Sequence, residues 1–207
     1  RWNGASKARP IIAIHGWLDN SASFAPLAAH LKAPLIAIDL PGHGLSSHLP
    51  DGNWYHFVDY AVRLHEIIEK LELKKFHLMG HSIGAGIGVL YSATFPEHLD
   101  KLILLDGAGP MINEPEDAPK ILRNSILNRN KPCRKPRLMD LETAIKLRMT
   151  GGSIEKKSAQ LLVQGQITAQ GEKFIWSYDE KINYISPLRM SPAQLSAFLK
   201  KVDAPTL

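Results

Sequence analysis

The stretch that most constrains the fold of this chain runs from residue 76 to residue 86 and reads FHLMGHSIGAG. It starts as a short apolar run, typical of a buried strand, and continues as a run of small residues that can lie close on a sheet as a helix. Between the two lies a Gly-x-Ser-x-Gly pattern centred on Ser82. Glycines at positions 80 and 84 allow a sharp strand-to-helix turn, because a side chain at either position would meet neighbouring backbone. The stretch therefore predicts a nucleophile elbow, although an ordinary Gly/Ser turn between a strand and a helix is the alternative.

Apolar runs and amphipathic segments alternate along the first half of the chain. Each apolar run is nearly continuous and short, which is typical of strands in a parallel sheet covered on both faces. Ligands of such sheets bind beyond the carboxyl ends of the strands, where the glycine-rich loops of this chain also fall. The expected strands are 11–14, 35–38, 76–79 and 102–105, and the expected helices are a segment capped by Asn20 or Ser21 that includes Leu31, then 54–71 and 83–95.

After Pro110 the alternation stops and helical patterns follow one another. We expect helices at 118–127, 140–149, 154–163 and 192–201, the last capped by Ser191, and a strand-like piece at 174–178. This pattern predicts an α/β core over residues 1–110, a helical lid over 111–201 and the start of a further core strand at 202–207. Both ends suggest cuts through a larger fold. We therefore expect the isolated chain to be poorly stable, because an apolar sheet edge would be uncovered.

Composition excludes several classes of protein. The apolar fraction is 44%, the charged fraction is 22%, and no apolar run is long enough to span a membrane. A single cysteine, Cys133, rules out an internal disulfide framework and favours a cytoplasmic or other reducing intracellular compartment. No metal-ligand spacing is present, and Gly42-x-Gly44 lacks the rest of a nucleotide-binding motif.

The net charge of +5 is concentrated in residues 120–137, which hold seven Lys or Arg and no Asp or Glu. The run has no interleaved aromatic residues, and Pro132 and Pro136 would break a groove-reading helix. We therefore expect a solvated face of the lid and no nucleic-acid partner. The sequence gives no indication of the oligomeric state.

Four motifs occur in an order that resembles the α/β-hydrolase superfamily. They are the strand leading into His15-Gly16-Trp17, the loop at residues 39–46, the elbow at residues 80–84, and Leu105-Asp106-Gly107. The amino-acid sequences of residues 15–20 and 41–47 resemble those of the serine hydrolase-like branch. The resemblance is strong over residues 10–110 and loose over the lid.

The resemblance implies a serine hydrolase without cofactors that acts on a small-molecule acyl substrate. Ser82 would be the nucleophile, and the backbone N–H groups of Trp17 and Ile83 would form the oxyanion hole. The triad acid would be Asp106 or a residue after the following strand, which would lie beyond Leu207. The implied substrate-binding residues, some of which could equally be ordinary packing, are His15, Gly16, His81, Met111 and Trp176, with Tyr178 beside them.

The sequence lacks an evident general base for the triad. The triad of the fold runs Ser, acid, His along the chain, yet all nine histidines precede Asp106. His81, whose side chain diverges from that of Ser82 at an elbow, and His15 and His43, which the resemblance implies hold their loops in place, are the alternative candidates for the base, although none fits the usual geometry of the triad. We therefore expect an esterase-like enzyme that is inactive or crippled within these 207 residues. The alternatives are a catalytically dead ligand-binding or interaction protein, and a C–C hydrolase or acyltransferase.

Overall fold

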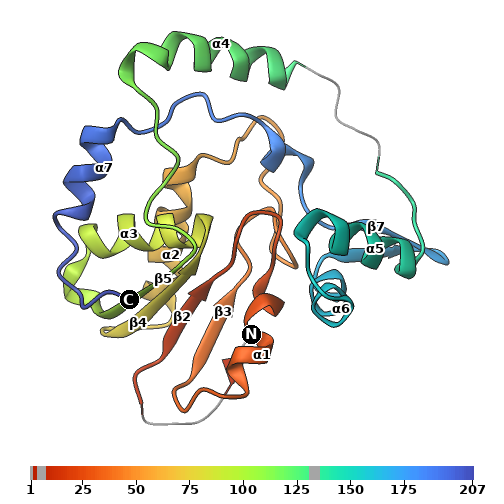
Figure 1. The fold of residues 1–207 in the computed structure, drawn as a ribbon, viewed down its shortest axis with the longest axis horizontal. Coiled ribbons are helices and arrows are strands. Elements are labelled where there is room, and N and C mark those ends of the chain that lie inside the picture. The colour runs from red at the N-terminus through yellow and green to blue at the C-terminus, as the bar shows by residue number, and fades with distance from the viewer. Residues whose placement is uncertain (1, 4–7, 131–135) are drawn as a thin grey trace.

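The computed structural model describes residues 2–3, 8–130 and 136–207, and its centre is a five-stranded sheet (Figure 1). The order across the sheet is β1-β3-β2-β4-β5, and every pair is parallel except β1 with β3. The predicted parallel α/β fold is confirmed, while the two-residue β1 was not predicted because it is too short to show a period. The strands are β1 (Trp2–Asn3), β2 (Ile11–Ile14), β3 (Leu35–Ile38), β4 (Phe76–His81) and β5 (Leu99–Leu105).

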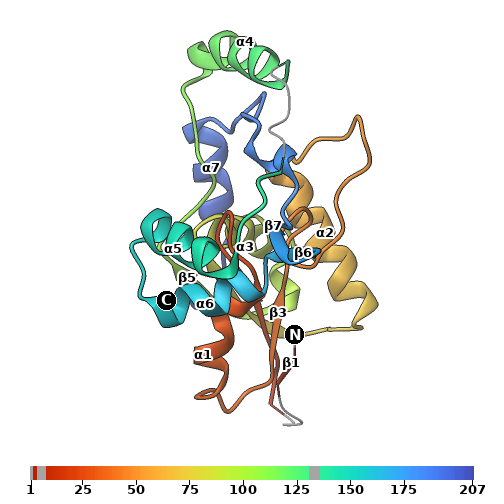
Figure 2. The ribbon, with the colours of Figure 1, turned by 90° about the vertical axis from the view of Figure 1, so that its right-hand side faces the viewer.

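Helices cover both faces of this sheet, as Figure 2 shows. Successive residues of β2 point to opposite faces, so Ile12 packs in a cluster with Leu64 of α2 (Phe57–Lys70) and Ile87 of α3 (Ile83–Thr94). Ala13 packs instead with Phe24, the last residue of the 3-10 turn η1 (Ser21–Phe24), which leads into α1 (Ala25–Ala28). Burying one such isoleucine side chain contributes about 2 kcal/mol. Both faces are therefore apolar, which explains why the strands are continuous apolar runs.

The second half of the chain forms a smaller helical layer with its own apolar cluster, which includes Met139, Ile145 and Val163. Helices α5 and α6 pack against each other, and α4 lies farther from the sheet (Figures 1 and 2). The elements after β4 that complete the chain are η2 (Pro96–His98), η3 (Pro115–Asp117), α4 (Ala118–Arg129), α5 (Leu141–Gly152), α6 (Lys156–Gln164), the antiparallel hairpin β6 (Ile167–Gln170) and β7 (Lys173–Trp176), η4 (Glu180–Asn183) and α7 (Pro192–Leu199).

Several element boundaries differ from the sequence expectation. The first predicted helix is only a 3-10 turn followed by one α-helical turn, because the Asn20 side chain accepts from the Ala22 N–H and starts a tighter turn. Helix α2 begins at Phe57, after His56 in extended conformation, rather than at residue 54. The strand-like piece predicted at 174–178 corresponds to β7, the second strand of the β6–β7 hairpin, which ends at Trp176. Ser191 caps α7 as predicted, within a capping box completed by Gln194.

The last residues of the chain lie beside β5. The N–H of Leu207 donates to the carbonyl of Leu102 at 3.0 Å, and the N–H of Leu102 donates to that of Pro205 at 3.0 Å. Leu102 and Thr206 form a parallel bridge. Within the predicted segment 202–207, residues 205–207 therefore extend the sheet locally. The division into core and lid at residue 110 stays a prediction.

The basic run at 120–137 is described only in part. Lys120 and Arg123 are exposed on α4, as a solvated face requires. Arg129 lies over the ring of Trp54, with its guanidinium carbon 4.2 Å from the ring centroid. Residues 131–135, with Cys133 and Pro132 among them, lie outside the described residues.

Candidate active site

Ser82 occupies the turn between β4 and α3. Its backbone has φ 52° and ψ −113°, a conformation that side-chain-bearing residues rarely adopt. Two backbone hydrogen bonds hold this turn: the Ser82 N–H donates to the Leu105 carbonyl at 2.9 Å, and the Ala85 N–H donates to the Ser82 carbonyl at 3.0 Å. Strand, strained serine and helix therefore have the geometry that the elbow motif predicts.

The two glycines of the motif are required by close backbone approach. A Cβ on Gly80 would overlap the carbonyl of Gly84, and a Cβ on Gly84 would overlap the carbonyl of Ile14 at the end of β2. The elbow therefore packs directly on the neighbouring strand, with no side chain between them. This contact brings Ser82 next to the loop that follows β2.

That loop, residues 15–20, lies against the elbow at Gly16. A Cβ on Gly16 would be 2.8 Å from Nδ1 of His81 and 3.6 Å from the Cβ of Ser82. Ile83 begins α3, so its N–H is among the groups that a helix leaves without an intrahelical acceptor. The loop and the helix start thus bring the backbones of Trp17 and Ile83, the two expected oxyanion-hole residues, to neighbouring places around Ser82.

His15 holds the loop in place instead of titrating near neutral pH. Its ring is fully buried, Nε2 accepts from the Leu40 N–H at 2.9 Å, and Nδ1 lies 2.7 Å from the Gly16 carbonyl. This network assigns the proton to Nδ1 and leaves the ring neutral. Burial also lowers the pKa of His15. Both nitrogens are therefore engaged, and neither is available as the base for Ser82.

His43 is also buried and neutral. Burial, and the proximity of the His15 ring at 5.2 Å between centroids, lower the pKa of His43 to about 4. Its Nδ1 lies 3.2 Å from the Pro41 carbonyl, and among the described residues its Nε2 has no hydrogen-bond partner. His43 therefore supports the loop at 39–46 from within the core.

Asp39 supports the same region from the end of β3. Its carboxylate accepts from the N–H groups of Ser21 at 2.6 Å and Leu45 at 2.9 Å. Burial alone would raise the pKa of Asp39, but these hydrogen bonds outweigh it and hold the pKa below its usual value. Asp39 is thus an ionised structural anchor, the supporting role expected for a strand-end acid.

Asp106 lies at the end of β5, near the backbone of the elbow. A Cβ on Gly107 would be 3.0 Å from the Ser82 carbonyl oxygen and 3.4 Å from its Cα. Asp106 itself is exposed and has a positive φ of 50°, a second strained position beside Ser82. Its place fits a triad acid, and its role stays a prediction.

A cavity near the elbow begins at Trp17. It has a volume of about 370 Å³ and is mostly apolar. Trp176, predicted to bind substrate, lines it together with Tyr178, whereas Met111 lies exposed on the connection after β5 and is not among the lining residues. The full lining is Trp17, Leu18, Leu147, Arg148, Gly151, Gln166, Trp176 and Tyr178.

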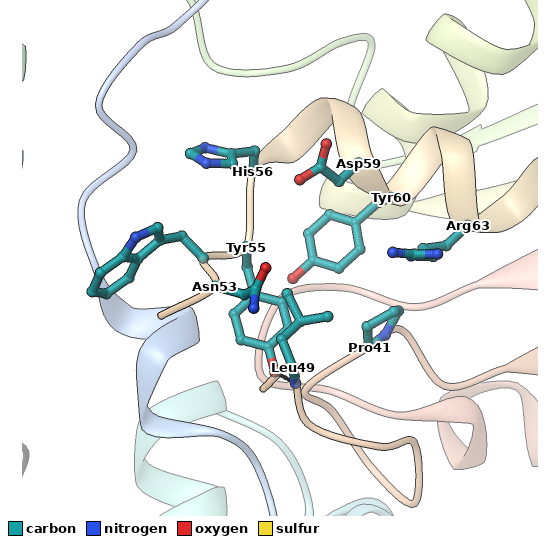
Figure 3. A pocket seen from close by; sticks show the side chains of 9 residues that line it. Pro41, Leu49, Asn53, Tyr55, His56, Asp59, Tyr60 and Arg63 are labelled. Carbon is teal, nitrogen blue, oxygen red and sulfur yellow. Dashed lines mark hydrogen bonds between the residues drawn. The ribbon is translucent and has the colours of Figure 1, made fainter. Parts of the chain in front are cut away.

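A second cavity, of about 90 Å³, lies between the start of α2 and the loop that precedes it (Figure 3). Tyr55 lines it and donates to Asp179 at 2.7 Å, which ties this loop to the start of η4. Its volume is well below the roughly 300–1,000 Å³ that is typical of small-molecule pockets. The cavity is too small for an acyl substrate.

Sequence reasoning missed the contacts that the helical layer after residue 110 makes with the loop at 15–20. Arg148, Gln166 and Leu162 of this layer each hold one residue of that loop through a hydrogen bond. Nothing in the sequence marks these three contacts, since neither a side chain nor a backbone carbonyl indicates a partner more than a hundred residues away.

Across residues 2–3, 8–130 and 136–207, no group of three or more His, Cys, Asp or Glu side chains is placed to hold a metal ion. No helix within this part of the chain is both long and apolar enough to cross a membrane.

Residues 9–129 match the family model of the α/β-hydrolase fold, over more than half of the chain. The chain therefore belongs to the α/β-hydrolase family. Within it, the chain belongs to the serine hydrolase-like branch. It is 32% identical over 209 residues to a serine hydrolase-like protein of Danio rerio, an alignment that covers 97% of this chain and 64% of the relative. A serine hydrolase-like protein of Dictyostelium discoideum is 31% identical over 218 residues, with 100% and 60% covered. The chain thus spans less than two thirds of either relative.

Solved structures agree with this assignment. A hypothetical protein of Pseudomonas aeruginosa PAO1 superposes with a TM-score of 0.92 at 34% identity, covering 99% of this chain and 74% of that one. A thioesterase domain from the curacin biosynthetic pathway superposes with a TM-score of 0.82 at 25% identity, covering 99% and 75%.

Proposed function

We propose that Ser82 is the nucleophile of a hydrolase that cleaves a carboxylic ester, or a related thioester or amide, through an acyl-enzyme. The observation that carries this proposal is the strained Ser82 backbone at the start of α3, packed against Gly16 of the adjoining loop. That arrangement exposes a hydroxyl beside two sets of backbone donors, which is what acyl transfer requires.

The proposed reaction has two steps. The Ser82 oxygen attacks the carbonyl carbon and its proton passes to a base. The tetrahedral oxyanion accepts hydrogen bonds from the N–H groups of Trp17 and Ile83. The leaving alcohol, thiol or amine departs with that proton, and water then cleaves the acyl-enzyme by the same route in reverse. One oxyanion donor is worth about 3 kcal/mol of transition-state stabilisation.

The cavity at Trp17 is the proposed site of the acyl group. Its aromatic lining, with Trp176 and Tyr178, favours an apolar acyl chain or ring. Arg148 also lines the cavity, but its charge is paired with Asp19 at 2.6 Å. A neutral acyl group is therefore favoured over an anionic one. The thioesterase named among the structural neighbours supports including thioesters in the substrate class.

The proposal assigns no base within residues 1–207. The chain has no histidine after Asp106, and the rings of His15 and His43 are held in the core. We therefore expect the 207 residues alone to hydrolyse esters far below the rate of an intact triad, retaining at most the roughly 10³-fold advantage over water that binding and an oxyanion hole supply. A longer natural protein that adds a histidine should be active.

The same observation favours a second candidate, a catalytically dead protein that binds its ligand in the cavity at Trp17. Labelling of the full-length natural protein with a fluorophosphonate probe separates the two. The hydrolase predicts an adduct on Ser82 that is lost in Ser82→Ala and kept in Ser92→Ala, a buried serine of α3. Absence of the adduct in the folded wild-type protein would reject the hydrolase in favour of the binding protein.

A further inference from the structure

The loop at 15–20 contains a second strained residue, Leu18. Its φ of 56° lies in the left-handed region, where a leucine is uncommon. The turn is closed by a hydrogen bond from the Asp19 N–H to the Gly16 carbonyl at 3.1 Å. A strained residue of this kind persists only when the surrounding structure fixes it.

The surrounding structure is the lid. Three consecutive residues of the loop each hold one hydrogen bond to it. The Leu18 carbonyl accepts from Nε2 of Gln166 at 2.7 Å, and the Asp19 carboxylate accepts from Nη2 of Arg148 at 2.6 Å. The side-chain amide of Asn20 donates to the Leu162 carbonyl at 2.9 Å. We call Arg148, Leu162 and Gln166 the lid clamp.

Two features show that the clamp is tightly built. A Cβ on Gly165 would overlap the side chain of Asn20, so the lid backbone approaches the loop as closely as it can there. Gln166 is only 3% exposed, and across the described part of the chain its Oε1 has no partner. The amide of Gln166 is therefore buried with the Leu18 carbonyl as its recorded hydrogen-bond partner.

We infer that Arg148 and Gln166 are positioning residues that hold Leu18 and Asp19 so that the Trp17 N–H faces the oxyanion at Ser82. Trp17 directly precedes the clamped residues, and Gly16 before it lies against Ser82. With both sides of Trp17 fixed, the direction of its peptide N–H is fixed as well. The inference rests on the proposed function for its catalytic consequence and on the observed hydrogen bonds for its structural one.

The kinetic test uses the active full-length protein and a matched control. Gln166→Met removes the donor to Leu18 at nearly constant volume, and Arg148→Met removes the partner of Asp19. Ser125→Ala is the control, because it removes a buried lid hydrogen bond, to the Ile185 carbonyl at 2.7 Å, that does not involve the loop. We expect kcat to fall about tenfold or more in both clamp variants, because only the transition state uses the oxyanion donor, while KM also changes to the extent that these two side chains contact the acyl group in the cavity.

Conservative variants sharpen this test. Arg148→Lys keeps a cation for Asp19 and should recover most of the kcat lost in Arg148→Met. Gln166→Glu can donate to Leu18 only when protonated, so its kcat relative to wild type should rise as the pH falls. Loss of kcat in Ser125→Ala equal to that in the clamp variants, or a rise in KM with kcat unchanged, would overturn the inference.

A second measurement keeps the inference testable if the protein has no hydrolytic activity. Amide hydrogen exchange of peptides covering residues 16–20 should accelerate at least tenfold in Gln166→Met and stay unchanged in Ser125→Ala. Unchanged exchange in Gln166→Met would overturn the clamp, whatever the fluorophosphonate result. Accelerated exchange without any Ser82 adduct would instead leave the clamp standing and reject the hydrolase.

Discussion

The guanidinium of Arg148 and the carboxylate of Asp19 lie 2.6 Å apart, although 129 residues separate them in the chain. Their side chains are only 20% and 11% exposed, so water screens the pair weakly. We expect Asp19→Asn and Arg148→Met each to lower the free energy of unfolding by about 2 kcal/mol. In a double-mutant cycle by urea denaturation the coupling should be at least about 1 kcal/mol. Additive effects of the two substitutions would contradict the structure.

The contact of Gly84 with the β2 backbone predicts that adding one methyl group at this position strongly lowers the stability of the protein. In Gly84→Ala the new Cβ would overlap the Ile14 carbonyl, a backbone group that cannot rotate away. We expect a loss of about 3 kcal/mol or more in unfolding free energy. Gly151→Ala is the control, because open space surrounds that position in α5 and alanine favours a helix. A Gly84→Ala protein as stable as Gly151→Ala would argue against so close an elbow.

The backbone of Ser82 predicts a stabilising substitution. Glycine adopts a positive φ without the steric cost that a serine has at 52°. We therefore expect Ser82→Gly to be about 1 kcal/mol more stable than Ser82→Ala, which removes the hydroxyl but keeps the Cβ. Thermal unfolding of the two variants measures this difference, and an alanine variant at least as stable as the glycine variant would mean that the turn is unstrained.

Stability should fall as the pH decreases from about 6.5 to 4. His43 has a folded-state pKa of about 4, below the ordinary value of 6.5, so the unfolded chain takes up this proton first. The stabilisation is therefore complete above pH 6.5 and lost as the pH falls through that window. The shift corresponds to an upper bound of about 3 kcal/mol, and the lowered pKa of His15 acts in the same direction.

Urea denaturation at several pH values checks this dependence. His43→Gln should flatten the slope between pH 6.5 and 4, because the substituted side chain does not titrate. The exposed His30 provides the control, and His30→Gln should leave most of the slope in place. An unchanged slope in His43→Gln would show that another group carries the acid sensitivity.

The elbow and the parallel sheet could be predicted because their determinants are local. Gly80 and Gly84 mark the turn within five residues. The strand at 11–14 consists entirely of apolar residues, which by itself predicts that the strand is buried. The spacing of the apolar residues after Asn20 predicted the local structure less reliably. Phe24 and Leu27 fit a helical stripe, yet Leu27 is 36% exposed, because a 3-10 turn precedes the α-helical one and rotates it away from the core.

The contacts of the loop at 15–20 could not be predicted, because they join side chains far apart in the chain. Gln166 and Leu18 are separated by 148 residues. A single glutamine forms no periodic pattern, so the sequence does not indicate which residue it contacts. The left-handed conformation of Leu18 likewise has no local signal, since glycine and asparagine are the residues that usually mark it. The hydrogen bond from Gln166 in the helical layer helps to explain why a leucine can occupy that position.

The hydrogen bond between Gln166 and Leu18 also sets an order of events during synthesis. The elbow pairs with β2 and β5 and needs nothing beyond Leu105, so it can form once that residue has left the ribosome. The loop at 15–20 must wait for roughly sixty further residues, because Arg148, Leu162 and Gln166 are translated later. On a nascent chain stopped between these points, Ser82 would already be in its turn while Leu18 had no partner from the lid. The turn that carries Ser82 therefore forms early, and its surroundings are completed late.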